Sequence, residues 1–71
     1  MTTKEAISKV FNSMPIGTQF RGWELKKRVS ELKPSLQNVY TDTVLRKFRE
    51  ICHGRYKVCG PYSQSLYEKI S

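Results

Sequence analysis

The chain has 71 residues, of which 38% are hydrophobic, and 13 lysines and arginines against six acidic residues give it a formal net charge of +7. A chain of this length forms one domain around one core, and its large surface relative to its volume makes a deep catalytic cleft hard to build. The positive excess favours a polyanionic partner, of which nucleic acid is the most common.

The first predicted element is a helix over about residues 3–14. Thr2 and Glu5 have the spacing of a capping box, in which each side chain accepts a hydrogen bond from an unpaired backbone N–H of the first turn. The apolar residues that follow repeat at helical spacing and form one stripe: Ala6, Ile7, Val10, Phe11 and Met14. Pro15 ends the helix, and the linker 16–20 has apolar ends that predict a brief strand.

A second helix is predicted over about residues 22–33 and ends before Pro34, which disfavours helix in the residue before it. Its apolar residues share one face: Leu25, Val29 and Leu32. The connection that follows, residues 35–40, fits either one turn of helix or a loop in which Leu36 and Val39 face the core.

Trp23 lies well away from the apolar stripe of the second helix. Because indole rings are readily buried, we expect Trp23 to cover the core beside the first helix. The alternative is an exposed Trp23, which would mark an interface with a second copy or with a partner.

A third helix is predicted over about residues 41–53, with Thr41 as its N-cap and Asp42 near the positive end of the helix dipole. Its apolar residues again form one stripe: Val44, Leu45, Phe48, Ile51 and Cys52. Gly54 follows, where a glycine commonly ends a helix.

The remaining residues, about 55–70, predict a β-hairpin. Residues 55–59 alternate and are rich in β-forming types, residues 60–64 are turn-like, and residues 65–70 return with a weaker alternation. Along the returning segment Leu66, Glu68 and Ile70 share one face, and Tyr67 points to the other. We expect the hairpin to cover apolar side chains that the tail would otherwise expose: Tyr56, Val58, Leu66 and Ile70.

No catalytic or metal-binding constellation is evident. The two cysteines, Cys52 and Cys59, have neither the spacing of a zinc knuckle nor the density of a disulfide scaffold, so we expect two reduced, partly buried thiols. His53 points about 100° away from Cys52 on a helix and forms no nucleophile–base pair with it. Carboxylates are scattered and glycines stand singly, so we expect no enzyme, no cofactor and no small-molecule substrate.

No apolar stretch approaches the roughly 20 residues that span a bilayer. The first residues also lack the apolar segment of a signal peptide. We therefore expect no membrane partner and a cytoplasmic location, in association with the nucleoid if the source is bacterial.

The order helix, short strand, helix, helix, hairpin resembles the winged helix-turn-helix DNA-binding family, over residues 2–70. Residues 17–29 look like the short strand of that family running into its second helix, and residues 41–50 look like its recognition helix. The connection 33–40 is longer than that of a tight helix-turn-helix. The resemblance implies an α+β, mainly α fold, in which a three-helix bundle carries a C-terminal β-hairpin wing. It also implies a transcriptional regulator that binds double-stranded DNA through helix 41–53 and hairpin 55–70.

The outward face of the third helix supplies the candidate base contacts. At about 100° per residue, Arg46 and Glu50 lie opposite the apolar stripe, and Lys47 and Arg49 flank it. A guanidinium can hold O6 and N7 of guanine with two hydrogen bonds, so we expect Arg46 to contact a base, Thr43 a thymine methyl or a phosphate, and Lys47 and Arg49 the backbone.

The alternative for this face is a merely solvated one, in which Arg46 pairs with Asp42 or Glu50, each four residues away. The regional charge argues against this alternative, since the segment from Arg21 to Lys57 contains ten basic residues and only four acidic ones. Further candidate nucleic-acid contacts lie at the start of the third helix, on the second helix and on the hairpin: Tyr40, Thr41, Lys26, Lys27, Arg55, Lys57, Tyr62, Ser63 and Gln64. The resemblance implies the contacts of the second helix and of the wing.

A second class of function stays open. Winged helices also act as protein-interaction modules, here with a basic face for an acidic partner, for example a phage-type modulator of a host complex. RNA binding is a weaker alternative, because the chain has neither the aromatic β-platform of an RRM nor the GxxG loop of a KH domain. A homodimer that reads two half-sites would have to use the first helix or the hairpin edge.

Overall fold

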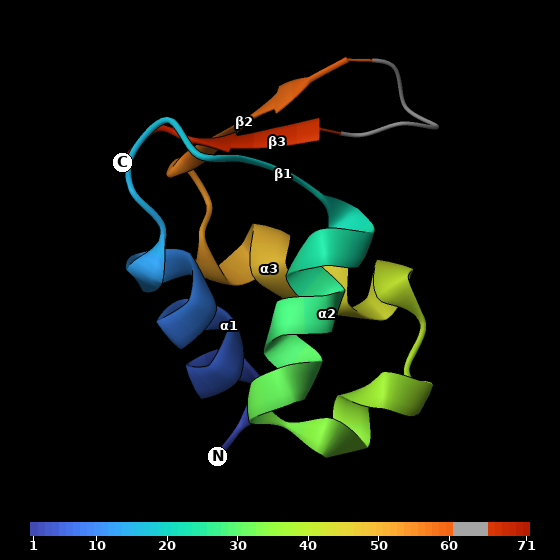
Figure 1. The fold of residues 1–71 in the computed structure, drawn as a ribbon. Coiled ribbons are helices and arrows are strands. Elements are labelled where there is room, and N and C mark those ends of the chain that lie inside the picture. Colours follow the sequence, from blue (N-terminus) through green and yellow to red (C-terminus); the bar gives the residue numbers. More distant parts are fainter. Residues whose placement is uncertain (61–65) are drawn as a thin grey trace.

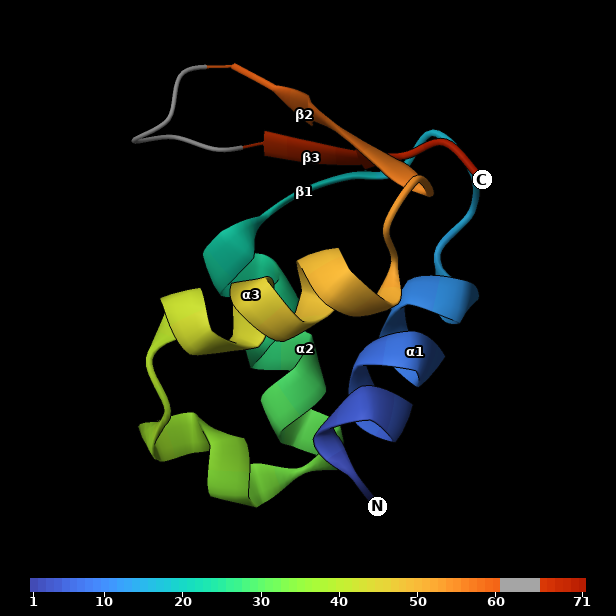
Figure 2. The same ribbon diagram turned by 180° about the vertical axis from the view of Figure 1, so that it is seen from behind.

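A computed structural model describes residues 1–60 and 66–71, and its elements follow the predicted order (Figures 1 and 2). They are α1 (Thr3–Ser13), β1 (Gln19–Arg21), α2 (Gly22–Leu32), the 3₁₀ helix η1 (Pro34–Asn38), α3 (Thr41–Ile51), β2 (Tyr56–Cys59) and β3 (Leu66–Lys69). The three α-helices pack against one another, and the strands form a small sheet over one end of them (Figure 1). This is the predicted α+β, mainly α arrangement with a C-terminal hairpin, and it agrees with a winged-helix topology.

α1 begins with the predicted capping box. The Glu5 N–H donates to Thr2 Oγ1 over 3.1 Å, and the Thr2 N–H donates to Glu5 Oε1 over 3.2 Å. The hydrogen bond from the Thr2 backbone N–H stabilises the Glu5 carboxylate and, as the largest cause, lowers the pKa of Glu5 below its usual value. The helix ends at Ser13, one residue before the predicted end, because Met14 is already extended ahead of Pro15.

The carboxyl end of α1 is closed by a lysine from β3. Lys69 Nζ donates to the carbonyl oxygens of Phe11 and Met14 over 2.9 and 2.7 Å, and it lies 4.9 Å from the centroid of the Phe11 ring. The Lys69 residue is only 6% exposed. A cation at the negative end of the helix dipole therefore joins the first helix of the chain to its last strand.

α2 begins at Gly22 as predicted and ends at Leu32, one residue earlier than expected. Leu25 and Val29 are buried, but Leu32 is exposed. The connection after α2 is helical, one of the two predicted alternatives, and its 3₁₀ helix η1 buries Leu36. Lys26 Nζ of α2 donates a hydrogen bond to the Gln37 carbonyl of η1 over 3.2 Å.

The first turn of α2 packs against the Leu45 side chain of α3. A Cβ placed on Gly22 would lie 2.6 Å from Cδ1 and 3.3 Å from Cγ of Leu45, and Leu45 is itself buried. A larger residue at position 22 therefore fits only if the Leu45 side chain shifts.

We expect Gly22→Val to lower the free energy of unfolding by about 1–3 kcal/mol, because Leu45 must leave its packed position. Urea denaturation followed by circular dichroism would measure the change. The same substitution in a Leu45→Ala background should cost much less, and an equal cost in both backgrounds would contradict this explanation.

α3 differs from its prediction at both ends. Tyr40, not Thr41, occupies the N-cap position, and no side chain caps this end. The helix stops at Ile51 instead of residue 53, because Cys52 leaves helical geometry as the C-cap. Gly54 then takes a positive φ of 79°, which reverses the chain into the hairpin.

The sheet has the order β1–β3–β2 and is antiparallel throughout. The inward face of β3 carries Tyr67 and Lys69, and the expectation that the hairpin covers Val58 and Ile70 is wrong. Val58 pairs with Tyr67 on β2, one of the two edge strands of the sheet, and it is 54% exposed.

Phe48 of α3 is fully buried at the centre of the core. Its ring centroid lies 4.9–5.7 Å from those of four other aromatic residues: Phe11, Phe20, Tyr56 and Tyr67. These rings come from α1, β1, β2 and β3, so one side chain of α3 holds the helices and the sheet together. No helix in the described part of the chain is long and apolar enough to cross a membrane.

Candidate nucleic-acid interface

α3 lies across one side of the bundle below the sheet, with its outward face uncovered by the other helices (Figure 2). Val44, Leu45 and Phe48 fix its inner face in the core. The outward positions are exposed, as the helical period predicts: Asp42, Thr43, Arg46, Lys47, Arg49 and Glu50.

The side chains of Arg46 and Lys47 form neither a hydrogen bond nor an ion pair with any residue in the described ranges. The alternative in which Arg46 pairs with Asp42 or Glu50 is therefore not seen. Both cations keep their full donor capacity toward solvent, and an anionic ligand would not have to displace a carboxylate from them.

Arg49 links α3 to the sheet. Its Nη1 donates to the Tyr67 hydroxyl over 3.3 Å, although the Arg49 residue is largely exposed. Burial raises the pKa of the neighbouring Tyr56, which stays a neutral phenol. The remaining Arg49 donors stay available where α3 and β3 meet.

The hairpin cations are more engaged than the sequence suggested. Lys57 Nζ lies 3.5 Å from Glu68 Oε2, and Gln19 Nε2 donates to Glu68 Oε1 over 2.9 Å. The Gln19 hydrogen bond and the Lys57 charge hold the pKa of Glu68 below its usual value. Arg55 donates to Asn12 Oδ1 over 3.0 Å and lies over the Phe11 ring, so it contacts α1.

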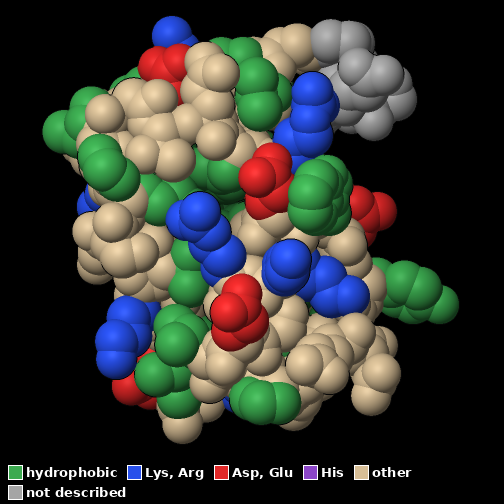
Figure 3. Space-filling view, viewed as in Figure 1, with side chains coloured by type: hydrophobic (Ala, Val, Ile, Leu, Met, Phe, Trp, Pro, Cys, Tyr) green, Lys and Arg blue, Asp and Glu red, His purple; other side chains and the backbone are tan. Residues whose placement is uncertain are grey.

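Tyr62, Ser63 and Gln64, the predicted contacts of the wing tip, lie outside the described residues. On α2, Lys26 is partly buried against η1, whereas Lys27 is exposed and has no partner among residues 1–60 and 66–71. Figure 3 shows basic and acidic side chains interspersed over the face that α2 occupies.

The start of α3 presents an aromatic and two hydroxyl side chains. Tyr40 is 85% exposed, Thr41 is half-buried and Thr43 is exposed. The structure thus brings Tyr40, Thr43, Arg46 and Lys47 together on one accessible surface.

Trp23 contradicts its prediction, because it is 60% exposed and does not cover the core. The reason lies in the residue before it. Gly22 occupies the position that packs against Leu45, and the next residue, about 100° further round the helix, turns outward. Sequence periodicity placed Trp23 off the apolar stripe, which was the signal for this exposure.

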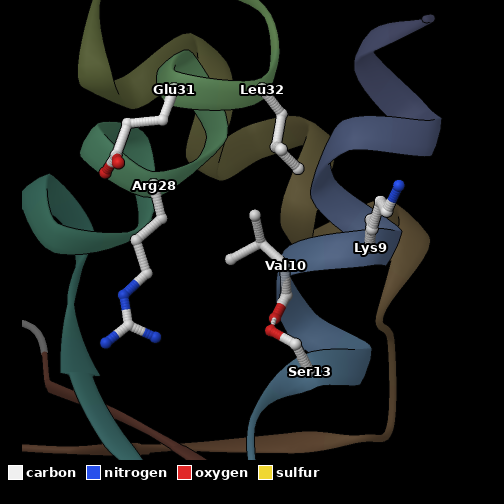
Figure 4. Close-up of a pocket in the computed structure, with 6 residues that line it drawn as sticks. All are labelled: Lys9, Val10, Ser13, Arg28, Glu31 and Leu32. Atoms are coloured by element: carbon white, nitrogen blue, oxygen red, sulfur yellow. Dashed lines mark hydrogen bonds between the residues drawn. The ribbon is translucent and has the colours of Figure 1, made fainter.

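A shallow groove of about 310 Å³ lies between α1 and α2 (Figure 4). Val10 and Leu32 form its apolar part, and Lys9, Arg28, Ser13 and Glu31 surround them. The Ser13 hydroxyl is already hydrogen-bonded to the Val10 carbonyl over 2.7 Å, so the polar groups that the groove can offer a ligand are the charged side chains around it.

No group of three His, Cys, Asp or Glu residues able to hold a metal ion occurs in the described part of the chain. Cys52 is buried, which raises the pKa of its thiol, and Cys59 is half-buried. The elevated pKa makes Cys52 a poor nucleophile and a poor metal ligand at neutral pH.

Compared with known proteins, the chain matches no family model, no curated sequence and no solved structure.

Proposed function

We propose that this protein is a winged helix-turn-helix protein that binds double-stranded DNA and acts as a transcriptional regulator. In this proposal the N-terminal half of α3 enters the major groove and the β2–β3 hairpin follows the backbone. The observation that carries it is the outward face of α3, where Arg46 and Lys47 are exposed without a partner among the described residues.

The proposal assigns a different role to each group on α3. Arg46 and Thr43 extend from the middle of the exposed face, where a helix in the major groove meets base edges. Lys47 lies at the flank and would contact phosphate. Glu50 lies one turn beyond Arg46, so contact would concentrate before it, since its carboxylate repels the backbone.

Arg49 would contact phosphate where α3 meets the sheet, because Tyr67 holds its guanidinium there. The wing would contribute Lys57, whose ion pair with Glu68 is exposed enough to open at little cost. Exposed cations release counterions from DNA on binding, which makes the affinity strongly salt-dependent.

We expect saturable binding to a fluorescently labelled duplex, with log K falling linearly as log salt rises. Arg46→Ala should weaken this binding by about tenfold or more, because a bidentate base contact is worth about 1–3 kcal/mol. Fluorescence anisotropy at several salt concentrations measures both effects.

Lys9→Ala is the matched control, since it removes an equal charge from α1, outside the proposed interface. It should change the affinity far less than Arg46→Ala does. Equal losses for the two variants would reduce the interaction to net charge, and the absence of binding at low salt would reject DNA as the partner.

A second candidate function is a protein-interaction module for an acidic partner. The observation that favours it is the groove of Figure 4, where apolar Val10 and Leu32 lie beside Lys9 and Arg28. A partner that binds at this groove would lose affinity with Leu32→Asp. DNA binding through α3 should weaken only by the amount that any substitution lowering the net positive charge by one unit would cause.

A further inference from the structure

We infer that Trp23 is a DNA contact in its own right, packing its indole against the sugar–phosphate backbone beside the groove that α3 enters. This inference rests on the proposed function and extends it, because it adds a contact from α2 that does not depend on ion pairing. The sequence had predicted Trp23 as a core residue.

The position of Trp23 connects it to the proposed interface. Gly22 lies against Leu45, one turn of α3 beyond Thr41, so the first turn of α2 adjoins the N-terminal half of α3. The two views of the fold agree on this, because the start of α2 lies next to α3, on the side toward which the hairpin extends (Figures 1 and 2). A duplex against Arg46 and Thr43 would therefore pass close to Trp23.

The exposed indole of Trp23 makes no polar contact that would stabilise the described part of the chain. The residue is 60% exposed, and its indole N–H has no hydrogen-bond partner among residues 1–60 and 66–71. An indole combines a large apolar face with a single donor, which suits a surface that offers both. The backbone of DNA does so, since deoxyribose presents apolar C–H groups next to phosphate oxygens.

The charges around Trp23 favour a polyanion over an acidic or apolar protein surface. Lys26 and Lys27 follow one turn later on α2, and no carboxylate neutralises either of them within the described ranges. The residue that follows Trp23 in the chain, Glu24, accepts a hydrogen bond from the Arg21 backbone N–H over 3.0 Å at the start of the helix. Both lysines thus follow Trp23 by one turn on α2, and the exposed Lys27 keeps its donors available for a phosphate next to the indole.

Trp23 is the only tryptophan in the chain, so its fluorescence reports on this one site. Titration of the full-length protein with an unlabelled duplex should change the indole emission and reduce its quenching by acrylamide. Trp23→Ala should weaken binding by about tenfold, measured by anisotropy on a labelled duplex, because a desolvated aromatic contact is lost.

The salt dependence separates this contact from an ionic one. Trp23→Ala should lower log K by the same amount at every salt concentration, so its line runs parallel to that of the wild type. Lys27→Ala should instead flatten the slope by about one unit. Ile16→Ala is the matched control, because Ile16 is 72% exposed in the turn before β1, away from α3, and its loss should not affect binding.

The outcomes are distinguishable. If DNA binds but the indole stays accessible to acrylamide and Trp23→Ala binds as tightly as the wild type, this inference is wrong and the proposed function stands. If no duplex binds by anisotropy, the proposed function fails and the inference fails with it. If the indole becomes protected with rising protein concentration in the absence of DNA, Trp23 belongs to a contact between two copies of the chain, and the inference is overturned.

Discussion

Replacing Phe48 by alanine is expected to leave a large part of the protein unfolded at ambient temperature. The ring is fully buried and contacts aromatic residues from α1 and from all three strands. Its removal should cost about 3–5 kcal/mol of the free energy of unfolding, through lost burial and the cavity left behind. A chain of this length has a total of only about 4–10 kcal/mol.

Thermal melting followed by circular dichroism would test this expectation. Phe48→Leu is the matched control, since it keeps most of the apolar volume and should lose far less stability. A Phe48→Ala protein that melts near the wild-type temperature would show that α3 and the sheet are held together by other contacts.

The second large effect is expected for Lys69→Met, which keeps an unbranched apolar side chain one atom shorter than lysine and removes the ammonium group with its three donors. The Phe11 carbonyl would retain the Met14 N–H at 3.1 Å, whereas the Met14 carbonyl would lose its only partner within the described residues. We expect a loss of about 3 kcal/mol, because charged hydrogen bonds are replaced by an unsatisfied polar group.

Urea denaturation would measure this loss, with Lys9→Met on α1 as the control. Lys9 is exposed and its side chain makes no hydrogen bond or ion pair with the described part of the chain, so its substitution should have little effect on stability. If Lys69→Met proves as stable as Lys9→Met, the buried ammonium costs as much to desolvate as its two hydrogen bonds return.

The elements that the sequence predicted correctly are those whose signals are local. The capping box of Thr2 and Glu5 and the stripe around Phe48 depend on spacings of three and four residues, which the helix period alone determines. The predicted helix ends were off by one or two residues, as at Cys52, where the backbone has already left helical geometry.

The features that were missed depend on residues far apart in the chain. Lys69 caps a helix that ended more than 50 residues earlier, and no sequence pattern around residue 69 predicts this contact. Trp23 turns outward next to Gly22, which packs against Leu45, and Val58 lies on an edge strand. Periodicity placed Trp23 off the apolar stripe, but composition and periodicity predict neither the contact of Gly22 with Leu45 nor the order of the strands.

In the candidate site, too, some features follow from local sequence signals and others depend on tertiary structure. The exposure of Thr43, Arg46 and Lys47 follows from helical period, so sequence alone could predict it. The engagement of Arg55 with Asn12 and of Lys57 with Glu68 required the register of the strands and the position of α1.

The order of the strands has a consequence for synthesis. β3 lies at the centre of the sheet, and both neighbours pair only with it, although β1 and β2 precede it in the chain. While the polypeptide grows from its amino terminus, β1 and β2 have no strand to join, and the carboxyl end of α1 lacks its lysine. Residues 66–69 therefore complete the sheet and the first helix in a single late event, and a nascent chain that stops short of them exposes two unpaired strands to aggregation.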